Sequence, residues 1–296
     1  MAQLIQDLIN ALALGGIYAL TTLGLVIVFG IMRLINFAYG ELIMIAGYAL
    51  WAITSNTGLP WIVALVISIA TATVAALLME RLAFRPLRSA SESTLFIASF
   101  GVSSFLQYAI EVYVWPRPVP VTIPSLFTSQ LVMASVRIPQ IDILSIAVSL
   151  LVLVLLSLML KSTLMGIALR AAAEDFTTTR LMGIDANRVI ALAFAIEGVL
   201  AGIVMVFWVG NSGVVYPQVG LTPVIIAFMA AVVGGMRSLT GAVVGGFVVG
   251  FLFTGLASFL PGQIQSYRQA LLFVLVVAIL LVRPGGIMQS GDLEEA

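Results

Sequence analysis

The chain has 296 residues, of which 61% are hydrophobic and only 9% are charged. Soluble domains contain about 45–50% apolar and about 25% charged residues, and a soluble core could not absorb this excess without exposing large apolar patches. The composition therefore excludes an ordinary soluble protein and predicts an integral membrane protein. The net charge is zero, which gives no indication of a nucleic-acid partner.

The chain contains neither Cys nor His. The lack of Cys excludes disulfides, thiolate nucleophiles and sulfur metal sites. The lack of His removes the commonest metal ligand and the commonest general base. These absences favour a conduit over an enzyme and indicate neither a metal nor a cofactor in this chain.

A helix needs roughly 20 mainly apolar residues to cross the hydrocarbon core of a membrane. We therefore expect an all-α, polytopic transmembrane bundle with about eight to ten spans. The first apolar run is expected to be a retained span, because no basic segment precedes it and no cleavage site follows it. Runs 34–53, which contains Glu41, and 221–235 are the weakest and are expected to be broken or re-entrant. The expected spans are 8–31, 34–53, 61–80, 94–114, 142–160, 190–209, 221–235, 241–260 and 268–283.

The positive charges predict the orientation of these spans. With nine spans and an external N-terminus, most Lys and Arg residues fall on the cytoplasmic side. Only Arg117, Arg137 and Arg268 fall outside. The four tryptophans lie near the outer ends of spans, which is typical of an interfacial belt.

Two long connections complete what we expect to be a single transmembrane domain over residues 1–296. Residues 115–141 contain five prolines among Val and Ile residues and are expected to form an extended, extracytoplasmic loop. Residues 161–189 are rich in helix formers and charges and are expected to form a helical, cytoplasmic segment. This segment either docks onto an ATPase or is a solvated loop that only sets the topology.

The cytoplasmic segment contains a candidate helix in which Glu174 and Asp175 lie in the earlier half and Arg180 in the later half. This order suits the helix macrodipole, and Gly183 can then end the helix. The chain lacks the phosphate-binding loop of ATPases, because its only lysine, Lys161, follows no glycine. Any ATP that drives this protein would therefore be bound by a separate subunit.

Seven short stretches, in order along nearly the whole chain, resemble branched-chain amino-acid permeases of the LivH type. Two lie near the N-terminus, three surround the cytoplasmic segment and two lie near the C-terminus. They are Ala13–Leu20, Ile35–Glu41, Arg170–Asp175, Leu181–Ile184, Arg188–Phe194, Gly234–Ala242 and Arg283–Gly286.

The resemblance implies a permease subunit of an ATP-driven (ABC) importer in the inner membrane. Such a subunit pairs with a second permease, either LivM-like or a copy of itself, and two ATPase subunits bind the cytoplasmic face. A periplasmic or surface binding protein delivers the substrate, which would be a branched-chain amino acid or a similar small solute such as urea or a short amide. By this analogy, the residues that couple the permease to the ATPase are Arg170, Glu174, Asp175, Arg180 and Gly183.

Four polar residues in or beside the spans are candidates for the translocation path or for contacts between helices: Asn36, Tyr39, Glu41 and Glu197. Charged groups inside a membrane usually face the protein interior or water. Two of the four depart from the family pattern. Tyr39 stands where such permeases commonly have His, and Glu197 stands where small apolar residues are expected.

No residues form a recognisable clamp for an amino-acid zwitterion, which favours substrate selection by the binding protein. The alternative is a stand-alone secondary transporter or channel that uses Glu41 or Glu197 for ion coupling. The glycine pairs Gly241/Gly245 and Gly246/Gly250 indicate close helix packing. Packing within the chain is favoured over a subunit interface.

Overall fold

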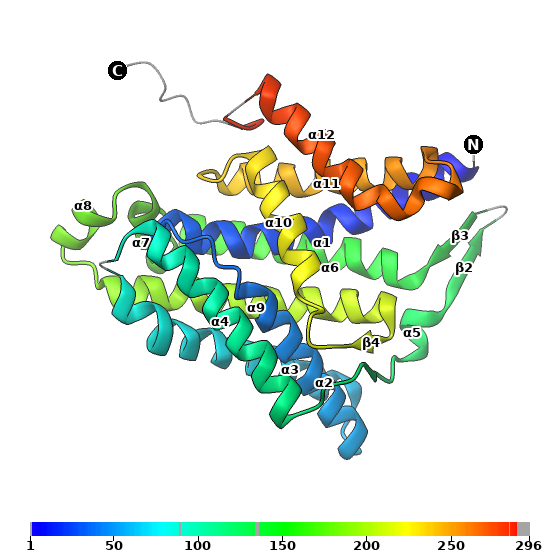
Figure 1. Ribbon diagram of the computed structural model, residues 1–296, viewed down its shortest axis with the longest axis horizontal. Helices are drawn as coiled ribbons and strands as arrows, with labels where there is room; N and C mark the ends of the chain where they lie inside the picture. Colours follow the sequence, from blue (N-terminus) through cyan, green and yellow to red (C-terminus); the bar gives the residue numbers. More distant parts are fainter. Residues whose placement is uncertain (1, 89, 134–135, 284, 289–296) are drawn as a thin grey trace.

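The computed structural model describes residues 2–88, 90–133, 136–283 and 285–288. It confirms the expected all-α, polytopic bundle (Figure 1). Within the described residues, seven helical segments are long and apolar enough to cross a membrane. Pro284, which belongs to one of the family-like stretches, lies outside the described residues. The seven segments are Gln3–Met32, Trp61–Leu87, Glu92–Tyr113, Gln140–Ser162, Ala186–Ser212, Leu239–Phe259 and Gly262–Val282.

The elements alternate between long helices and short connections. The first half of the chain contains α1 (Ala2–Met32), α2 (Tyr39–Asn56), α3 (Trp61–Met79), η1 (Glu80–Phe84), η2 (Arg85–Leu87), α4 (Glu92–Tyr113), β1 (Val119–Pro120), α5 (Ser125–Thr128), β2 (Gln130–Met133) and β3 (Val136–Pro139). The second half contains α6 (Gln140–Ser162), α7 (Leu164–Glu174), α8 (Phe176–Leu181), α9 (Ala186–Ser212), β4 (Val214–Val215), α10 (Leu221–Gly234), α11 (Leu239–Phe259), η3 (Gly262–Tyr267) and α12 (Arg268–Val282).

The two weakest predicted spans correspond to the shorter helices α2 and α10. Run 34–53 is helical only from Tyr39 onward, because residues 33–38 are irregular and Arg33 has a positive φ of 54°. A Cβ atom on Gly40 would lie 2.6 Å from the carbonyl oxygen of Gly220, so α2 and α10 begin with their backbones in contact. Each run nevertheless forms one continuous helix, so the expectation of a broken helix is wrong, and re-entrance stays a prediction.

Helix α1 forms the centre of the bundle and packs on α11, α9, α10 and α6. The predicted glycine packing within the chain is found here. A Cβ atom on Gly250 would lie 2.6 Å from the backbone nitrogen of Gly15, and one on Gly246 would collide with Ala19. Small residues thus let α1 and α11 approach closely, which is the main source of helix association in lipid.

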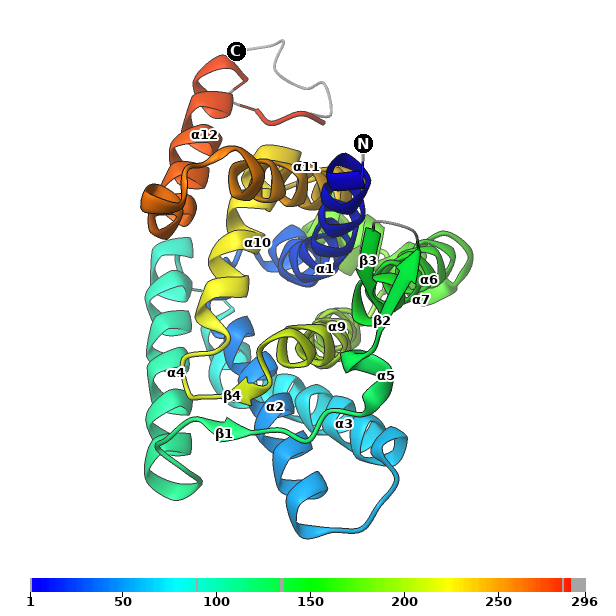
Figure 2. The ribbon, with the colours of Figure 1, turned by 90° about the vertical axis from the view of Figure 1, so that its right-hand side faces the viewer.

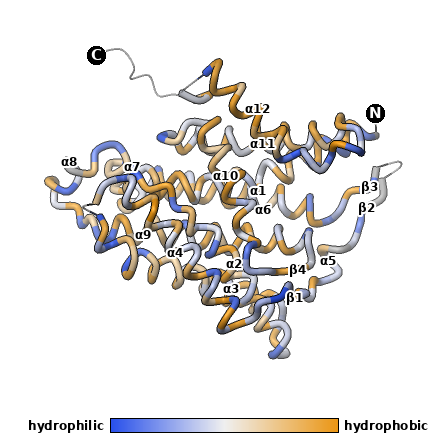
Figure 3. Tube along the Cα trace, in the orientation of Figure 1, coloured by the Kyte–Doolittle hydropathy of each residue, from blue (hydrophilic) through white to orange (hydrophobic). Residues whose placement is uncertain are grey.

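The bundle has two distinct ends, which Figure 1 shows at its left and right. The hairpin end contains residues 115–141 and 212–220, where β2 pairs with β3 and β1 pairs with β4, both antiparallel. The predicted extended chain is found in these strands, although the short helix α5 was not expected. The α8 end contains residues 80–91, 163–188 and 235–238. Figure 3 shows hydrophilic residues gathered around α8 and near the N-terminus, with apolar residues along the helices between them.

The residues that precede the helices differ between the two ends of the bundle. Helices that begin at the α8 end start with polar side chains that accept a hydrogen bond from a backbone N–H in the first turn, which is the usual N-cap. At the hairpin end, α3, α5 and α6 instead follow Pro60, Pro124 and Pro139. The polar caps are Ser91, Thr163, Asp175, Asp185 and Ser238.

Candidate functional site

Two of the four predicted intramembrane residues meet in the core. Asn36 lies in the irregular segment before α2, and its Nδ2 donates to both carboxylate oxygens of Glu197 on α9, at 3.0 and 3.1 Å. Both side chains are fully buried. The contact joins the α1–α2 connection to α9, so it explains why a carboxylate occurs at a position where a small apolar residue was expected.

Glu41 belongs to a separate polar contact between α2 and α4. Its Oε1 accepts hydrogen bonds from Ser103 Oγ at 2.8 Å and from Gln107 Nε2 at 2.7 Å. Glu41 is 1% exposed. Sequence reasoning missed Ser103 and Gln107, although their spacing of four residues inside an apolar run was a usable signal, because it places them on one helix face.

Tyr39 packs against α1. A Cβ atom on Gly24 would lie 2.6 Å from the phenolic oxygen of Tyr39, so the glycine makes room for the ring. The ring is completely buried. Within the described residues, the phenolic oxygen makes no hydrogen bond. Asn36 and Glu41 belong to separate contacts, because Asn36 bonds Glu197 on α9 and Glu41 bonds Ser103 and Gln107 on α4.

The predicted coupling segment is helical, but the expected single helix is wrong. The chain breaks between Glu174, which ends α7, and Asp175, whose carboxylate accepts a hydrogen bond from Thr178 N at 3.0 Å and so caps α8. Asp175 is a good N-cap residue, and this local preference overrides the run of helix formers before it. Gly183 follows α8 with a φ of 84°, which confirms its role as a helix-ending residue.

The remaining predicted coupling residues lie at the surface of this segment. Arg170 on α7 and Arg180 on α8 are exposed. Arg180 also lines a cavity of about 610 Å³ at the α8 end. The other residues that line this cavity are Arg88, Phe176, Ile184, Asp185, Ala186 and Asn187.

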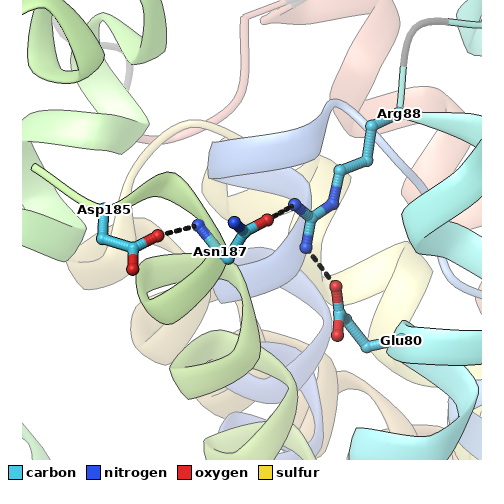
Figure 4. A network of polar contacts seen from close by, with 4 residues as sticks. All are labelled: Glu80, Arg88, Asp185 and Asn187. Carbon is cyan, nitrogen blue, oxygen red and sulfur yellow. Dashed lines mark hydrogen bonds and ion pairs between the residues drawn. The ribbon is translucent and has the colours of Figure 1, made fainter.

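Three of the residues that line this cavity, together with Glu80, form a polar network that the sequence did not indicate (Figure 4). Arg88, just after η2, donates to Asn187 Oδ1 at 2.6 Å and forms an ion pair with Glu80. Asp185 accepts a hydrogen bond from the backbone N–H of Asn187 at 2.9 Å. The network fastens the end of the α3–η2 helix to the start of α9, next to α8.

Two apolar side chains project from this charged segment. Leu181 is 81% exposed and Met182 is 79% exposed. Their neighbours in the chain include Arg180, Asp185 and Arg188, so the position lies in a polar part of the surface rather than along an apolar helix. The two side chains form a small exposed apolar group on an otherwise polar surface.

A second cavity, of about 710 Å³, opens at the hairpin end between α1, α9 and α10. Figure 2 views the bundle from this end. The lining combines polar and charged side chains with apolar and aromatic ones. The lining residues are Gln6, Asn10, Leu14, Ile17, Tyr18, Pro139, Asp142, Phe207, Trp208, Asn211, Ser212, Thr222, Ile226, Phe253, Gln265, Ser266, Arg268 and Gln269.

The sequence analysis missed this hairpin-end cavity. Asp142 and Arg268 lie at the edges of apolar runs. Their positions in the sequence therefore indicated only where spans begin and which side of the membrane the residues face. Trp208 was interpreted as part of an interfacial belt, but it lines the cavity. These residues lie far apart in the chain, and no local spacing rule brings them together.

A helical membrane bundle with a cavity lined by charged and apolar groups fits the class of membrane transport proteins. The model of the family described as "Branched-chain amino acid transport system / permease component" matches residues 8–280. The chain therefore belongs to this family of transport permeases. The resemblance to LivH-type permeases is confirmed.

Curated relatives agree over nearly the full length of the chain. The permease protein BraD of the high-affinity branched-chain amino acid transport system of Pseudomonas aeruginosa is 35% identical, covering 98% of this chain and 97% of the relative. LivH, the corresponding permease protein of Escherichia coli, is 33% identical with the same coverage. LivH of Salmonella typhimurium is 32% identical. No solved structure matches the chain.

Proposed function

We propose that this chain forms the translocation path of an ATP-driven importer for branched-chain amino acids in the inner membrane. Two ATPase subunits bind its α8 end, a second permease subunit pairs with it in the membrane, and a substrate-binding protein docks at its hairpin end. The exposed pair Leu181 and Met182, at the end of the capped helix α8 and just after it, carries this proposal. An ATPase surface that covers these side chains would remove them from water.

The α8 end is suited to transmit movement. Helix α8 is short and is separated from α7 by Asp175 and from α9 by the turn at Gly183. The start of α9 is fastened through Asn187 to Arg88. A push on α8 by a partner would therefore reach α9 and the α3–η2 helix together. Because α9 contacts α1, the movement can continue to the helices that line the hairpin-end cavity.

The hairpin end is suited to receive substrate. Its cavity opens away from α8 and lies on the side where the charge distribution predicts the cell exterior. A binding protein seated over β2, β3 and the mouth of the cavity would release its substrate directly into the bundle. We infer that Arg170, Glu174 and Arg180 contact the ATPase, and that Asp175 and Gly183 shape the segment that presents them.

The test is co-purification in mild detergent. The tagged chain is expressed with its neighbouring genes, and recovery of a P-loop ATPase and a second permease, with ATPase activity, is the expected result. Glu174→Lys reverses an exposed charge without removing the α8 cap and should reduce ATPase recovery, whereas Arg117→Glu, which reverses an exposed charge at the hairpin end, should not. A stable chain that purifies alone and transports solute without ATP would overturn the proposal.

A further inference from the structure

The hairpin-end cavity contains two side chains of opposite charge. Asp142 lies in the first turn of α6, and Arg268 is the first residue of α12. Within the described residues, neither forms an ion pair with a nitrogen–oxygen distance up to 4.0 Å, and neither side chain makes a hydrogen bond to the protein. The guanidinium of Arg268 instead stacks over the ring of Phe253, 4.0 Å from its centre.

The two charges cannot be explained as a structural pair. Helices α6 and α12 lie on opposite sides of α1 in both views of the bundle (Figures 1 and 2), and α1 supplies one wall of the cavity between them. Unpaired charges near low-dielectric walls attract groups of the opposite sign more strongly than they would in bulk water. A ligand with both charges can satisfy both side chains, whereas a simple anion or cation satisfies only one.

The apolar part of the lining suits an apolar substituent. Tyr18 and Phe253 meet edge to face, with ring centres 6.1 Å apart, and Ile17, Ile226 and Phe207 complete this part of the wall. The volume of about 710 Å³ lies within the usual range for small-molecule pockets. A cavity lined by both charges and by aromatic and aliphatic groups matches an amino acid with an apolar side chain.

We propose that this cavity is a substrate site within the permease itself and that it binds zwitterionic amino acids with apolar side chains. Asp142 faces the ammonium group, and Arg268 faces the carboxylate. The inference rests on the proposed import of amino acids and adds that the permease contributes to selection, in place of leaving it wholly to a binding protein. Urea and short amides lack both charges and are poor ligands for such a site.

The experiment measures binding to the purified permease complex in nanodiscs without a binding protein. The probes are L-leucine, leucinamide, which keeps the ammonium but lacks the carboxylate, and 4-methylpentanoate, which keeps the carboxylate but lacks the ammonium. The chain has four tryptophans, and Trp208 lines the cavity. A change in tryptophan fluorescence therefore reports binding, and the Trp208→Phe variant shows whether the change comes from this site.

The expected pattern separates the two charges. Asp142→Asn should weaken leucine and leucinamide at least about tenfold and leave 4-methylpentanoate unchanged, because a hydrogen-bonded charge contributes on this scale. Arg268→Gln should weaken leucine and 4-methylpentanoate and leave leucinamide unchanged. Arg137→Gln on the exposed hairpin is the matched control and should change nothing. The conservative variants Asp142→Glu and Arg268→Lys should restore part of the binding, and they guard against loss of folding.

The inference is overturned if wild type binds none of the three probes, or if both variants weaken all probes equally. Leucine uptake by the complete importer is measured in parallel. Normal uptake with no binding to the cavity would reject this site and leave the proposed function intact. Absence of leucine uptake and of leucine binding would reject both, because the proposed substrate itself would then be wrong.

Discussion

Both ends of this molecule contain charged and apolar residues, but the two types are arranged in opposite ways. At the α8 end, Arg88 and Glu80 pair with each other, Asp185 caps a helix, and apolar Leu181 is left exposed. At the hairpin end, Asp142 and Arg268 form no ion pair within the described residues, and apolar side chains line the same cavity. Exposed apolar groups fit a protein partner, whereas unpaired charges fit a small polar solute. Under the proposed function, energy coupling belongs to the α8 end and substrate entry to the hairpin end.

The largest expected effect comes from the exposed pair at the α8 end. Replacing both Leu181→Asp and Met182→Asp should lower uptake roughly a hundredfold, since apolar anchors at an interface can contribute several kcal/mol. The chain should still insert, because both side chains are exposed in the isolated chain. Uptake of radiolabelled leucine, normalised to the amount of chain in the membrane, checks this.

The control is the double variant Leu181→Met and Met182→Leu. It keeps an apolar side chain at both positions and should therefore keep uptake. Full uptake by the double aspartate variant would contradict the assignment of coupling to the α8 end.

Substitutions in the core between the two ends should change the free energy of unfolding. Glu197→Ala should lower the free energy of unfolding by about 1–3 kcal/mol, because the buried amide of Asn36 loses its partner. Glu197→Gln should be much milder, since a glutamine amide can still accept from Asn36 Nδ2 and can donate to Asn36 Oδ1, which has no partner within the described residues. Thermal unfolding in detergent distinguishes the two variants.

Glu111 is the control for Glu197, because its carboxylate accepts a hydrogen bond from Gln218 Nε2 at the exposed hairpin end. Glu111→Ala should have little effect on unfolding. Equal losses for Glu111→Ala and Glu197→Ala would show that the buried contact is not what stabilises the core.

A third prediction concerns the helix contact on which both ends depend. Gly250→Ala should destabilise the bundle by about 1–3 kcal/mol, because its Cβ would overlap the backbone of Gly15 and overpacking has this cost. Gly255→Ala on the same helix should be neutral, since nothing lies within 4 Å of a Cβ at that position. The difference between their melting temperatures measures the α1–α11 contact. No difference would contradict the close approach.

The smallest effect is expected at Glu41. Ser103→Ala removes one of two hydrogen bonds to its carboxylate and should cost about 0.6 kcal/mol, the average for contacts between helices in membranes. Ser104→Ala changes the exposed neighbouring residue and should have no effect. Melting curves of the two variants give this comparison. A larger loss for Ser104→Ala would mean that α4 packs in a different register.

The long helices could be predicted because length and hydropathy are local properties. The irregular start at residues 33–38 was also foreseeable from the weak run around Glu41. The Asn36–Glu197 contact was not, since it joins residues 161 positions apart and no spacing rule reaches that far. The cap at Asp175 lay within reach, because Asp followed by Phe and three Thr is a reasonable helix start. The helix formers before it favoured a single continuous helix instead.

The site residues divide in the same way. Gly183 could be identified from a short, continuous family-like stretch, and Arg180 directly precedes that stretch. Asp142 and Arg268 belong to different helices, and only the folded bundle brings them to one cavity. A charged residue at the edge of an apolar run has an ordinary explanation as the end of a span. Its proposed role in ligand binding can be inferred only once the structure shows an oppositely charged residue that lines the same cavity.

The most direct test of the division between the two ends uses single cysteines, since the chain has none of its own. Asn211→Cys at the hairpin-end cavity and Met182→Cys at the α8 end are labelled in intact cells with a membrane-impermeant maleimide. Gln130→Cys on the exposed hairpin is the control for ligand protection. The account predicts that Asn211→Cys reacts from outside and is protected by leucine, that Gln130→Cys reacts without protection, and that Met182→Cys reacts only after permeabilisation. Labelling of Met182→Cys in intact cells, or no effect of leucine at Asn211→Cys, would contradict it.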